Sequence, residues 1–202
     1  MNVDWTPPTL ETERLILRPV TPADATAVFL YASNPNVTRF TLFETHQTIN
    51  DSRLFVGDYV RARYASREPD PFGIVPKRDP VPMVIGALGA HWVSQPNGTM
   101  EMGYSIAEPY WGRGLVVEAA RALMRYVFTE YAVERLQSQV ILGNDASERV
   151  LQKLGFTREG VLRSLIFRRE RWWDIAMYSM LRSECEMAFP TGPRPTEPTR
   201  PE

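Results

Sequence analysis

The sequence predicts a mixed α/β fold in which flanking helices cover one central sheet of about seven strands. Three observations predict this fold class. The chain has 202 residues and 44% hydrophobic content, which suits one domain with a buried core. Segments with strand and helix periodicity follow each other in the order β-α-α-β-β-β-α-β-α-β-β. The three consecutive strands in the middle favour a layered sheet over an alternating, doubly wound one.

The first third of the chain is expected to form one strand and two helices. Residues 10–19 alternate apolar and polar side chains, which is the period of a strand. Thr21 to Asp24 combines a threonine cap, a proline at the first helical position and an aspartate three residues after the cap. Asn34 to Asn36 ends this helix. A second cap signature at Thr48 to Asp51 begins the next helix, whose apolar face extends to Tyr64.

The middle of the chain is rich in strands. Residues 71–75 are short and begin with proline, so we expect them at the edge of the sheet. Residues 84–90 are apolar or small throughout, as in a strand buried on both faces. Gln95 to Gly98 is a turn signal, so a hairpin is expected to lead into a strand at Thr99 to Ile106.

The last part of the chain predicts elements of both kinds. We expect a helix after residue 114, a strand at 135–142, a helix at 145–154 that Gly155 ends, and antiparallel strands at 157–167 and 172–181. From residue 190 the chain is rich in proline and threonine and can bury little surface. Residues 190–202 are therefore predicted to be a mobile, Pro-rich tail.

Composition disfavours several classes of function. The net charge of −1 gives no support for nucleic-acid binding. The single cysteine, Cys185, permits neither a disulfide within the chain nor a multi-cysteine metal site, and it fits a reducing compartment. His46 and His91 are too few and too scattered for a metal site, so we expect none. The sequence has no apolar run long enough to cross a bilayer and no signal-peptide pattern, which predicts a cytoplasmic protein without a membrane partner.

The stretch from Tyr110 to Ala119 is the most informative part of the sequence. It joins a predicted strand to an amphipathic helix through Gly112 and Gly114. Such a junction leaves backbone N–H groups unpaired, and the helix dipole favours negative charge there, which suits a phosphorylated ligand. Arg113 adds a cation, and the helix has no acidic side chain before Glu118. Two glycines alone can equally mark a simple turn, and the missing third glycine argues against a dinucleotide fingerprint.

A second group of polar residues follows the strand predicted at 135–142. Asn144 and Ser147 stand at the start of the next helix, and Lys-Leu-Gly-Phe at 153–156 ends it. In isolation, Asn144 is best interpreted as a turn residue and Ser147 as a residue of the first helical turn. Their significance depends on the pattern of the whole chain.

Taken together, these segments resemble the GCN5-related N-acetyltransferases (GNAT), and more closely the branch that acetylates the N-termini of ribosomal proteins. The resemblance covers about residues 9–183 and implies a single acetyltransferase domain with the GNAT fold. Four segments carry it: Leu10 to Arg18, Glu101 to Tyr104 with Pro109 to Gly114, Asn144 to Phe156, and Trp172 to Leu181.

The resemblance implies that acetyl-CoA is the co-substrate. In the family it lies in a V-shaped opening between two central parallel strands, here Thr99–Ile106 and Arg135–Leu142. The N–H groups of residues 112–116 would bind its pyrophosphate, and the backbone near Ile106 would pair with the pantetheine like an added strand. The expected acetyl-CoA-binding residues are Ile106, Trp111, Gly112, Arg113, Gly114, Leu115, Val116, Asn144 and Ser147.

Two positions in the loop depart from the family pattern. Trp111 stands where the family usually has Gln or Arg, and Val116 stands where it has Gly or Ala. The branched side chain of Val116 is expected to lengthen the approach to phosphate slightly. Because N–H groups rather than side chains make the contacts, binding is still expected.

Acyl transfer to an amine requires the loss of an ammonium proton, a donor for the oxyanion and protonation of the leaving thiolate. Direct attack in a ternary complex needs no covalent nucleophile. By resemblance, Glu159 is the favoured base and Glu101 is the alternative, and either can act through water. Ser147 resembles the residue that protonates the thiolate in this branch, with Tyr104 as the second candidate.

The acceptor is expected to be a primary amine, most simply the α-amine of a protein N-terminus. Its groove would be built from the loop at residues 39–46, between the first two helices, together with the final strands. The sequence leaves open a small antibiotic or metabolite amine, another acyl donor, and a non-catalytic module that binds acyl-CoA. It also leaves open whether the protein is a monomer or a homodimer.

Overall fold

The computed structural model describes residues 5–80 and 82–188 of the chain. The tail predicted at residues 190–202 lies outside the described residues. The described residues form two compact units, one within Met1–His91 and Gly103–Ala122 and the other within Trp92–Met102 and Leu123–Glu202.

The described chain forms a mixed α/β fold with eight strands in the order β1-β2-β3-β4-β5-β6-β8-β7. The β5–β6 pair is parallel, whereas the pairs β1–β2, β2–β3, β3–β4, β6–β8 and β7–β8 are antiparallel. The bounds of the strands are β1 (Leu10–Glu11), β2 (Leu15–Pro19), β3 (Phe72–Pro76), β4 (Gly86–Ser94), β5 (Thr99–Ile106), β6 (Arg135–Ile141), β7 (Thr157–Arg168) and β8 (Arg171–Leu181).

The sheet has eight strands instead of the predicted seven because the first predicted strand folds back on itself. Leu10 pairs with Leu17, and Glu11 pairs with Ile16, so residues 12–14 form a tight hairpin. The N–H of Thr12 donates to the Leu15 carbonyl at 3.0 Å and closes this turn. Residues 11–14 are four consecutive polar residues, so the apolar–polar alternation stops at the turn, and the prediction of one continuous strand overlooked this signal.

The prediction that residues 71–75 form an edge strand was wrong. β3 lies between β2 and β4 and is buried along its whole length. Pro71 precedes the strand and Pro76 is its last residue. Residues 72–75 therefore keep their N–H groups for the ladder, and the rule that confines proline to edges does not apply here.

Two helices of the first unit begin after the predicted caps, Thr21 and Thr48, but the helix Pro35–Thr38 was not predicted: Asn34 ends the first helix and also caps this short second one, which begins with Pro35. Their bounds are η1 (Pro22–Asp24), α1 (Ala25–Ala32), α2 (Pro35–Thr38), α3 (Ile49–Leu54), η2 (Phe55–Tyr59) and α4 (Val60–Ala65). The side chain of Asp24 accepts from the N–H of Thr21 at 2.8 Å, and Asp51 accepts from Thr48 at 2.8 Å, as the capping pattern predicts. The second predicted helix contains a π-helical turn, η2, which the apolar spacing does not indicate.

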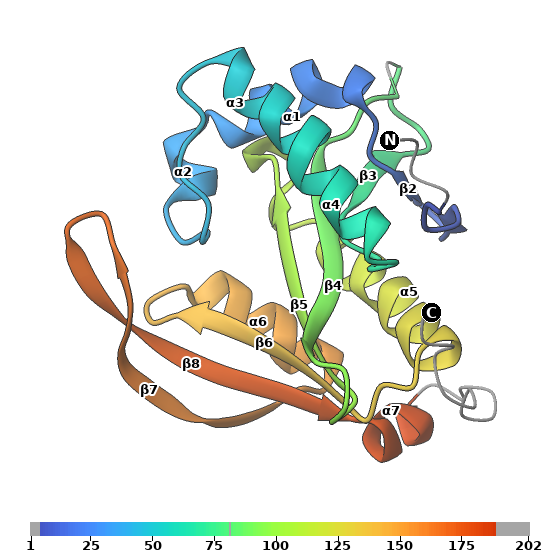
Figure 1. Cartoon of the computed structure of the whole chain (residues 1–202), viewed down its shortest axis with the longest axis vertical. Coiled ribbons are helices and arrows are strands. Elements are labelled where there is room, and N and C mark those ends of the chain that lie inside the picture. Colours follow the sequence, from blue (N-terminus) through green and yellow to red (C-terminus); the bar gives the residue numbers. More distant parts are fainter. Residues whose placement is uncertain (1–4, 81, 189–202) are drawn as a thin grey trace. The chain divides into compact units, whose positions relative to one another are not determined.

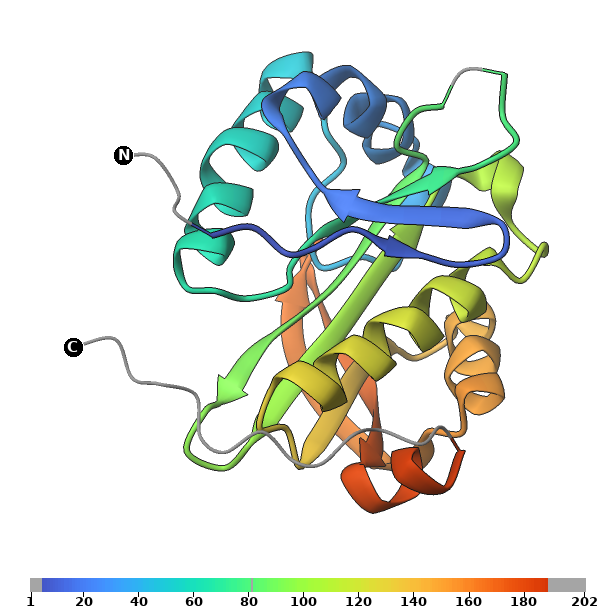
Figure 2. The same ribbon diagram turned by 90° about the vertical axis from the view of Figure 1, so that its right-hand side faces the viewer.

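The core of the first unit lies between these helices and strands β2 and β3. Figure 1 and Figure 2 show α1, α3 and α4 gathered over the strands. The hydroxyl of Tyr64 accepts from the N–H of Val20 at 2.8 Å and donates to the Pro71 carbonyl at 2.6 Å. The buried cluster consists of Val20, Ala25, Ala27, Val28, Tyr31, Ala32, Val37, Val56, Val60, Tyr64, Val75 and Val84.

The second unit carries the long β7–β8 hairpin, with α6 (Asp145–Leu154) beside β6 (Figure 1). Gly155 ends α6 at φ +87°, as predicted. The hydroxyl of Tyr178 on β8 donates to Glu148 on α6 at 2.7 Å. A further helix, α7 (Arg182–Ala188), follows β8 and was not predicted; Cys185 is buried in it.

Candidate active site

The glycine loop adopts the backbone conformation that the sequence predicts for an anion-binding turn. A short 3-10 turn, η3 (Glu108–Tyr110), follows β5, and the loop then enters α5 (Leu115–Glu130). Gly112 has φ +73° and Gly114 has φ +74°, both in the left-handed region that glycine adopts without strain. A Cβ added to Gly112 would meet no atom within 4 Å, so the backbone angle, not crowding, requires glycine there.

The loop presents a run of unpaired N–H groups. The first helical bond runs from the N–H of Glu118 to the Gly114 carbonyl at 3.1 Å. Within the described chain, the N–H groups of residues 112–117 have no hydrogen-bond partner. Residues 111–114 are exposed. Free donors, an accessible surface and the positive end of a 16-residue helix fit a diphosphate group.

Trp111 fixes the loop against the end of β5. Its indole Nε1 donates to the Ile106 carbonyl at 2.8 Å. The next N–H, that of Ala107, donates to the Ile85 carbonyl at 2.8 Å. The backbone near Ile106, where pantetheine pairing was predicted, thus already has an indole on its carbonyl. The guanidinium of Arg113 stacks on Tyr110, 5.3 Å from the ring centroid.

The sequence reasoning missed a polar cluster that supports the loop from the β1–β2 turn. Glu118 accepts from Thr12 Oγ1 at 2.6 Å, from the Arg14 N–H at 2.8 Å and from Arg14 Nε at 2.6 Å. Burial raises the pKa of Glu118, but these hydrogen bonds outweigh the effect and leave it below its ordinary value. No local signal links residues 12–14 to position 118, because over a hundred residues separate them.

Glu159 is held in an ion pair. Arg135 donates to its two carboxylate oxygens at 2.6 Å each, and Ser179 Oγ donates to Oε1 at 2.8 Å. The hydrogen bonds from Arg135, aided by Ser179, lower the pKa of Glu159 to about 2 despite the opposing effect of burial. A carboxylate with so low a pKa is a weak proton acceptor at neutral pH.

Glu101 has a different environment on β5. Gln137 Nε2 and Gln139 Nε2 both donate to its Oε2 at 2.9 Å. Oε1 has no hydrogen bond to any described residue. The β5–β6 ladder runs from Thr99–Arg135 to Glu101–Gln137, and at the next position Ser138 Oγ donates to the Met102 carbonyl at 3.0 Å. Glu101 therefore lies in the last pair of this ladder, half-buried, with one oxygen open.

Asn144 and Ser147 lie together at the start of α6. Asn144 is the N-cap residue, and its Oδ1 accepts from the N–H of Ser147 at 3.2 Å. The Nδ2 group of Asn144 has no hydrogen bond to a described residue. Both residues are half-buried, as is Tyr104 on β5. Asn144 thus combines a capping oxygen with a free amide donor.

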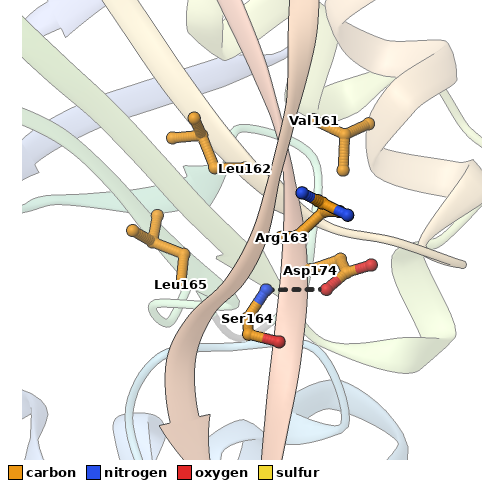
Figure 3. Close-up of a pocket in the computed structure, with 6 residues that line it drawn as sticks. All are labelled: Val161, Leu162, Arg163, Ser164, Leu165 and Asp174. Atoms are coloured by element: carbon orange, nitrogen blue, oxygen red, sulfur yellow. Dashed lines mark hydrogen bonds between the residues drawn. The ribbon is translucent and has the colours of Figure 1, made fainter.

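An open depression of about 680 Å³ lies on β7 and β8 (Figure 3). The register of the β7–β8 pairing shifts between Leu162 and Ile166, where β7 forms a bulge. Within the bulge, Ser164 has φ +48°, and its N–H donates to Asp174 Oδ1 at 2.8 Å. In Figure 3 the side chains of Leu162 and Leu165 project to one side of β7 and that of Arg163 to the other. The hairpin also exposes large apolar side chains: Val161, Leu162, Leu165, Phe167 and Trp172.

The two histidines have separate surroundings. His46 Nδ1 lies 2.7 Å from Ser52 Oγ, and burial lowers the pKa of His46. His91 Nδ1 lies 3.8 Å from Asp70. Among residues 5–80 and 82–188, no group of three His, Cys, Asp or Glu side chains is arranged to hold a metal ion. In the same residues no helix is both long and apolar enough to cross a membrane.

The strand order, the left-handed glycine loop and its free N–H groups fit the acyl-CoA-binding acyltransferase that the sequence resemblance implies. Comparisons with known proteins agree. The model of the GNAT acetyltransferase domain matches residues 14–157. The chain is 33% identical over 175 residues to the uncharacterized N-acetyltransferase YoaA of Bacillus subtilis, covering 87% of this chain and 97% of that protein.

One further relative and one solved structure with the same fold are described as acting on ribosomal proteins. The ribosomal-protein-serine acetyltransferase of Escherichia coli is 26% identical over 98 residues, covering 48% of this chain and 55% of that protein. RimL, a ribosomal L7/L12 alpha-N-protein acetyltransferase solved with coenzyme A, has a TM-score of 0.77 at 18% identity, covering 88% and 99% of the two chains. The chain belongs to the GNAT family and is an acetyl-CoA-dependent N-acetyltransferase.

Proposed function

We propose that this protein transfers the acetyl group of acetyl-CoA to the α-amine of a protein N-terminus, by direct attack in a ternary complex. The run of unbonded N–H groups at residues 112–117 carries the proposal, because it fits the diphosphate of coenzyme A. Residues Gly112 to Val117 supply these donors. Asn144 Nδ2 is a free donor suited to an amide of the pantetheine arm.

Glu101 is the better candidate for the base. Arg135 and Ser179 occupy the Glu159 carboxylate and hold its pKa near 2, whereas Glu101 keeps Oε1 open to a water molecule or an ammonium group. The amides of Gln137 and Gln139 fix the orientation of the Glu101 carboxylate through Oε2. These contacts support Glu101 as the proposed base in place of Glu159, which the resemblance favours.

In the proposed reaction, Glu101 removes a proton from the acceptor ammonium, directly or through water. The free amine attacks the thioester carbonyl, forming the N–C bond and a tetrahedral oxyanion. Collapse breaks the C–S bond, and the thiolate takes a proton from the hydroxyl of Ser147, with Tyr104 as the alternative donor. As the amide forms, its nitrogen gives up a second proton, which returns through water to Ser147. The proton held by Glu101 passes to solvent.

Two observations favour a peptide acceptor over a small amine. β7 is the last strand in the sheet order, so its outer backbone edge is available to an extended peptide. The apolar side chains exposed on β7 and β8 and the depression lined by Arg163 and Asp174 suit residues that follow a peptide N-terminus. The names of RimL and of the Escherichia coli relative support the same acceptor class.

A thiol-release assay with acetyl-CoA tests this function. The panel contains peptides that begin with Ala, Ser, Met or Asp, the same peptides with blocked α-amines and a free internal lysine, and a set of polyamines and aminoglycosides. We expect thiol release with at least one free peptide and none with its blocked form, and mass spectrometry should place the acetyl group on the α-nitrogen. Turnover of small amines alone would assign the protein to small-molecule acetylation.

Absence of turnover with every acceptor, together with tight binding of acetyl-CoA, would point to a regulatory acyl-CoA-binding module. Equilibrium binding of acetyl-CoA is therefore measured in parallel. The oligomeric state, monomer or homodimer, is determined by light scattering on the same sample.

A further inference from the structure

Arg14 reaches the glycine loop from the β1–β2 turn. Its Nη1 donates to the Arg113 carbonyl at 3.0 Å, and its Nε donates to Glu118 at 2.6 Å. A Cβ placed on Gly114 would lie 3.8 Å from Arg14 Nη2. Nη2 therefore lies beside the Gly114 backbone, where the chain turns into α5.

The third nitrogen of this guanidinium is available. Nη2 of Arg14 has no hydrogen bond to any described residue, although Nε and Nη1 are both used. The Arg14 side chain is 45% exposed. A guanidinium held by two of its nitrogens presents the third in a fixed direction, so a ligand gains a charge-assisted bond at little entropic cost.

Glu118 makes this cation necessary. Its carboxylate lies one turn inside α5, close to the donors that would meet a diphosphate, and an uncompensated negative charge there would repel phosphate. Three hydrogen bonds from Thr12 and Arg14 hold this carboxylate. The Arg14–Glu118 pair is close to neutral, and it leaves an N–H donor toward the loop.

We propose that Arg14 is a binding residue for acyl-CoA: Nη2 donates to a diphosphate oxygen over Gly114, while Glu118 and Thr12 position the guanidinium. This role rests on the proposed function of the loop as the diphosphate site. It adds a side-chain contact from the β1–β2 turn to a site otherwise made of backbone N–H groups.

The test compares two ligands that share the pantetheine arm. We measure the dissociation constants of acetyl-CoA and of pantetheine, which lacks the diphosphate, for the wild type, Arg14→Gln and Arg14→Lys. Arg14→Gln is expected to raise the dissociation constant of acetyl-CoA about tenfold, in line with the loss of one exposed charge-assisted hydrogen bond. The dissociation constant of pantetheine should stay unchanged. Arg14→Lys keeps the charge but loses the planar fork, so an intermediate loss is expected.

Arg61→Gln is the matched control. Arg61 is an exposed residue of α4 whose ion pair with Asp58 is 3.3 Å long, so this variant makes the same change in net charge away from the loop. It should bind both ligands like the wild type. Acetyl-CoA affinity should also depend less on salt in Arg14→Gln than in Arg61→Gln.

The outcomes separate this role from simple support of the fold. Equal weakening of acetyl-CoA and pantetheine in Arg14→Gln and Arg14→Lys would overturn the proposal, because a structural defect affects both ligands. Unchanged acetyl-CoA affinity in Arg14→Gln would also overturn it. If Gly114→Asp weakens the binding of acetyl-CoA and Arg14→Gln does not, the loop remains the diphosphate site and only the role of Arg14 fails. If neither variant weakens this binding, the proposed function itself fails.

Discussion

Arg135 and Glu159 form a two-bond ion pair, with Nη1–Oε1 and Nη2–Oε2 distances of 2.6 Å. They stand on β6 and β7, and the strand between them, β8, contributes Ser179 to the same carboxylate. Three donors on one carboxylate stabilise its charged form. The structural consequence is a cross-strand clamp. The chemical consequence is a carboxylate with little tendency to take up a proton.

The two candidate bases are separated by matched amide substitutions. We expect Glu101→Gln to lower kcat at least about a hundredfold, because general-base catalysis contributes factors of that order, and to leave the dissociation constant of acetyl-CoA unchanged. Glu159→Gln should keep kcat within about threefold of the wild type and leave the pH dependence of kcat unchanged. The loss of a true general base would lower kcat far more than threefold. Steady-state kinetics between pH 6 and pH 9 measure both. A large loss confined to Glu159→Gln would return the role of base to Glu159.

The ion pair between Arg135 and Glu159 should make the free energy of unfolding depend on pH. The pKa of Glu159 is lowered from 4.5 to about 2 in the folded protein, so its stabilising effect is fully present above about pH 4.5 and is lost as the pH falls toward 2. The side chain is 39% exposed, so we expect a contribution of about 1 kcal/mol or less to the free energy of unfolding.

Urea denaturation of the wild type and Glu159→Gln at pH 7, 5 and 3 measures this contribution. The difference between the two proteins should be present at pH 7, persist at pH 5 and shrink at pH 3. Asp58→Asn serves as the control, because its exposed pair with Arg61 is looser at 3.3 Å and should contribute less. A difference that stays constant down to pH 3 would contradict the ion-pair origin.

The conformation of Gly114 leads to a prediction about acetyl-CoA binding. At φ +74° an alanine pays roughly 1–2 kcal/mol for the left-handed backbone, although its Cβ would only approach Arg14. Gly114→Ala should therefore measurably weaken the binding of acetyl-CoA. Gly114→Asp should weaken this binding more, because repulsion between the carboxylate and the diphosphate adds to the backbone strain. Calorimetry gives both dissociation constants. Gly57→Ala, at a position with open space and no positive φ, is the control that should bind normally.

The sequence indicated the elements whose signals are local. The caps at Thr21 and Thr48 and the left-handed Gly155 each depend on side chains within three residues or on one backbone angle. The position of β3 inside the sheet depends on pairing with β2 and β4, which proline content cannot report. The π turn η2 lies inside a segment whose apolar spacing is that of one continuous α-helix, so the spacing does not indicate it.

The candidate site shows the same division. Gly112 and Gly114 could be found because glycine spacing before a helix is a local pattern with a known backbone consequence. The Glu159 clamp could not be found, because Arg135 is 24 residues away and the charge pattern does not say which cation pairs with which carboxylate. The contact between Arg14 and Glu118 spans 104 residues and exists only after the β1–β2 turn has formed.

Asn144 has two chemical functions that a single substitution can separate. Its Oδ1 caps α6 through the Ser147 N–H, while Nδ2 is free for the pantetheine arm. Asn144→Asp keeps a capping oxygen and adds a negative charge at the N-terminus of α6, where the helix dipole stabilises it. The melting temperature should therefore be unchanged or slightly higher. The same variant loses the amide donor, and KM for acetyl-CoA should rise by up to about tenfold, as expected for one lost hydrogen bond.

Asn144→Ala removes both functions and is the comparison variant. It should raise KM as much as Asn144→Asp does and also lower the free energy of unfolding by about 1 kcal/mol, because the cap is lost. Thermal denaturation and acetyl-CoA kinetics on the two variants give the four values needed. If Asn144→Asp matches the wild type in KM, then Asn144 serves α6 alone, and the donor to the pantetheine arm must be sought in another residue.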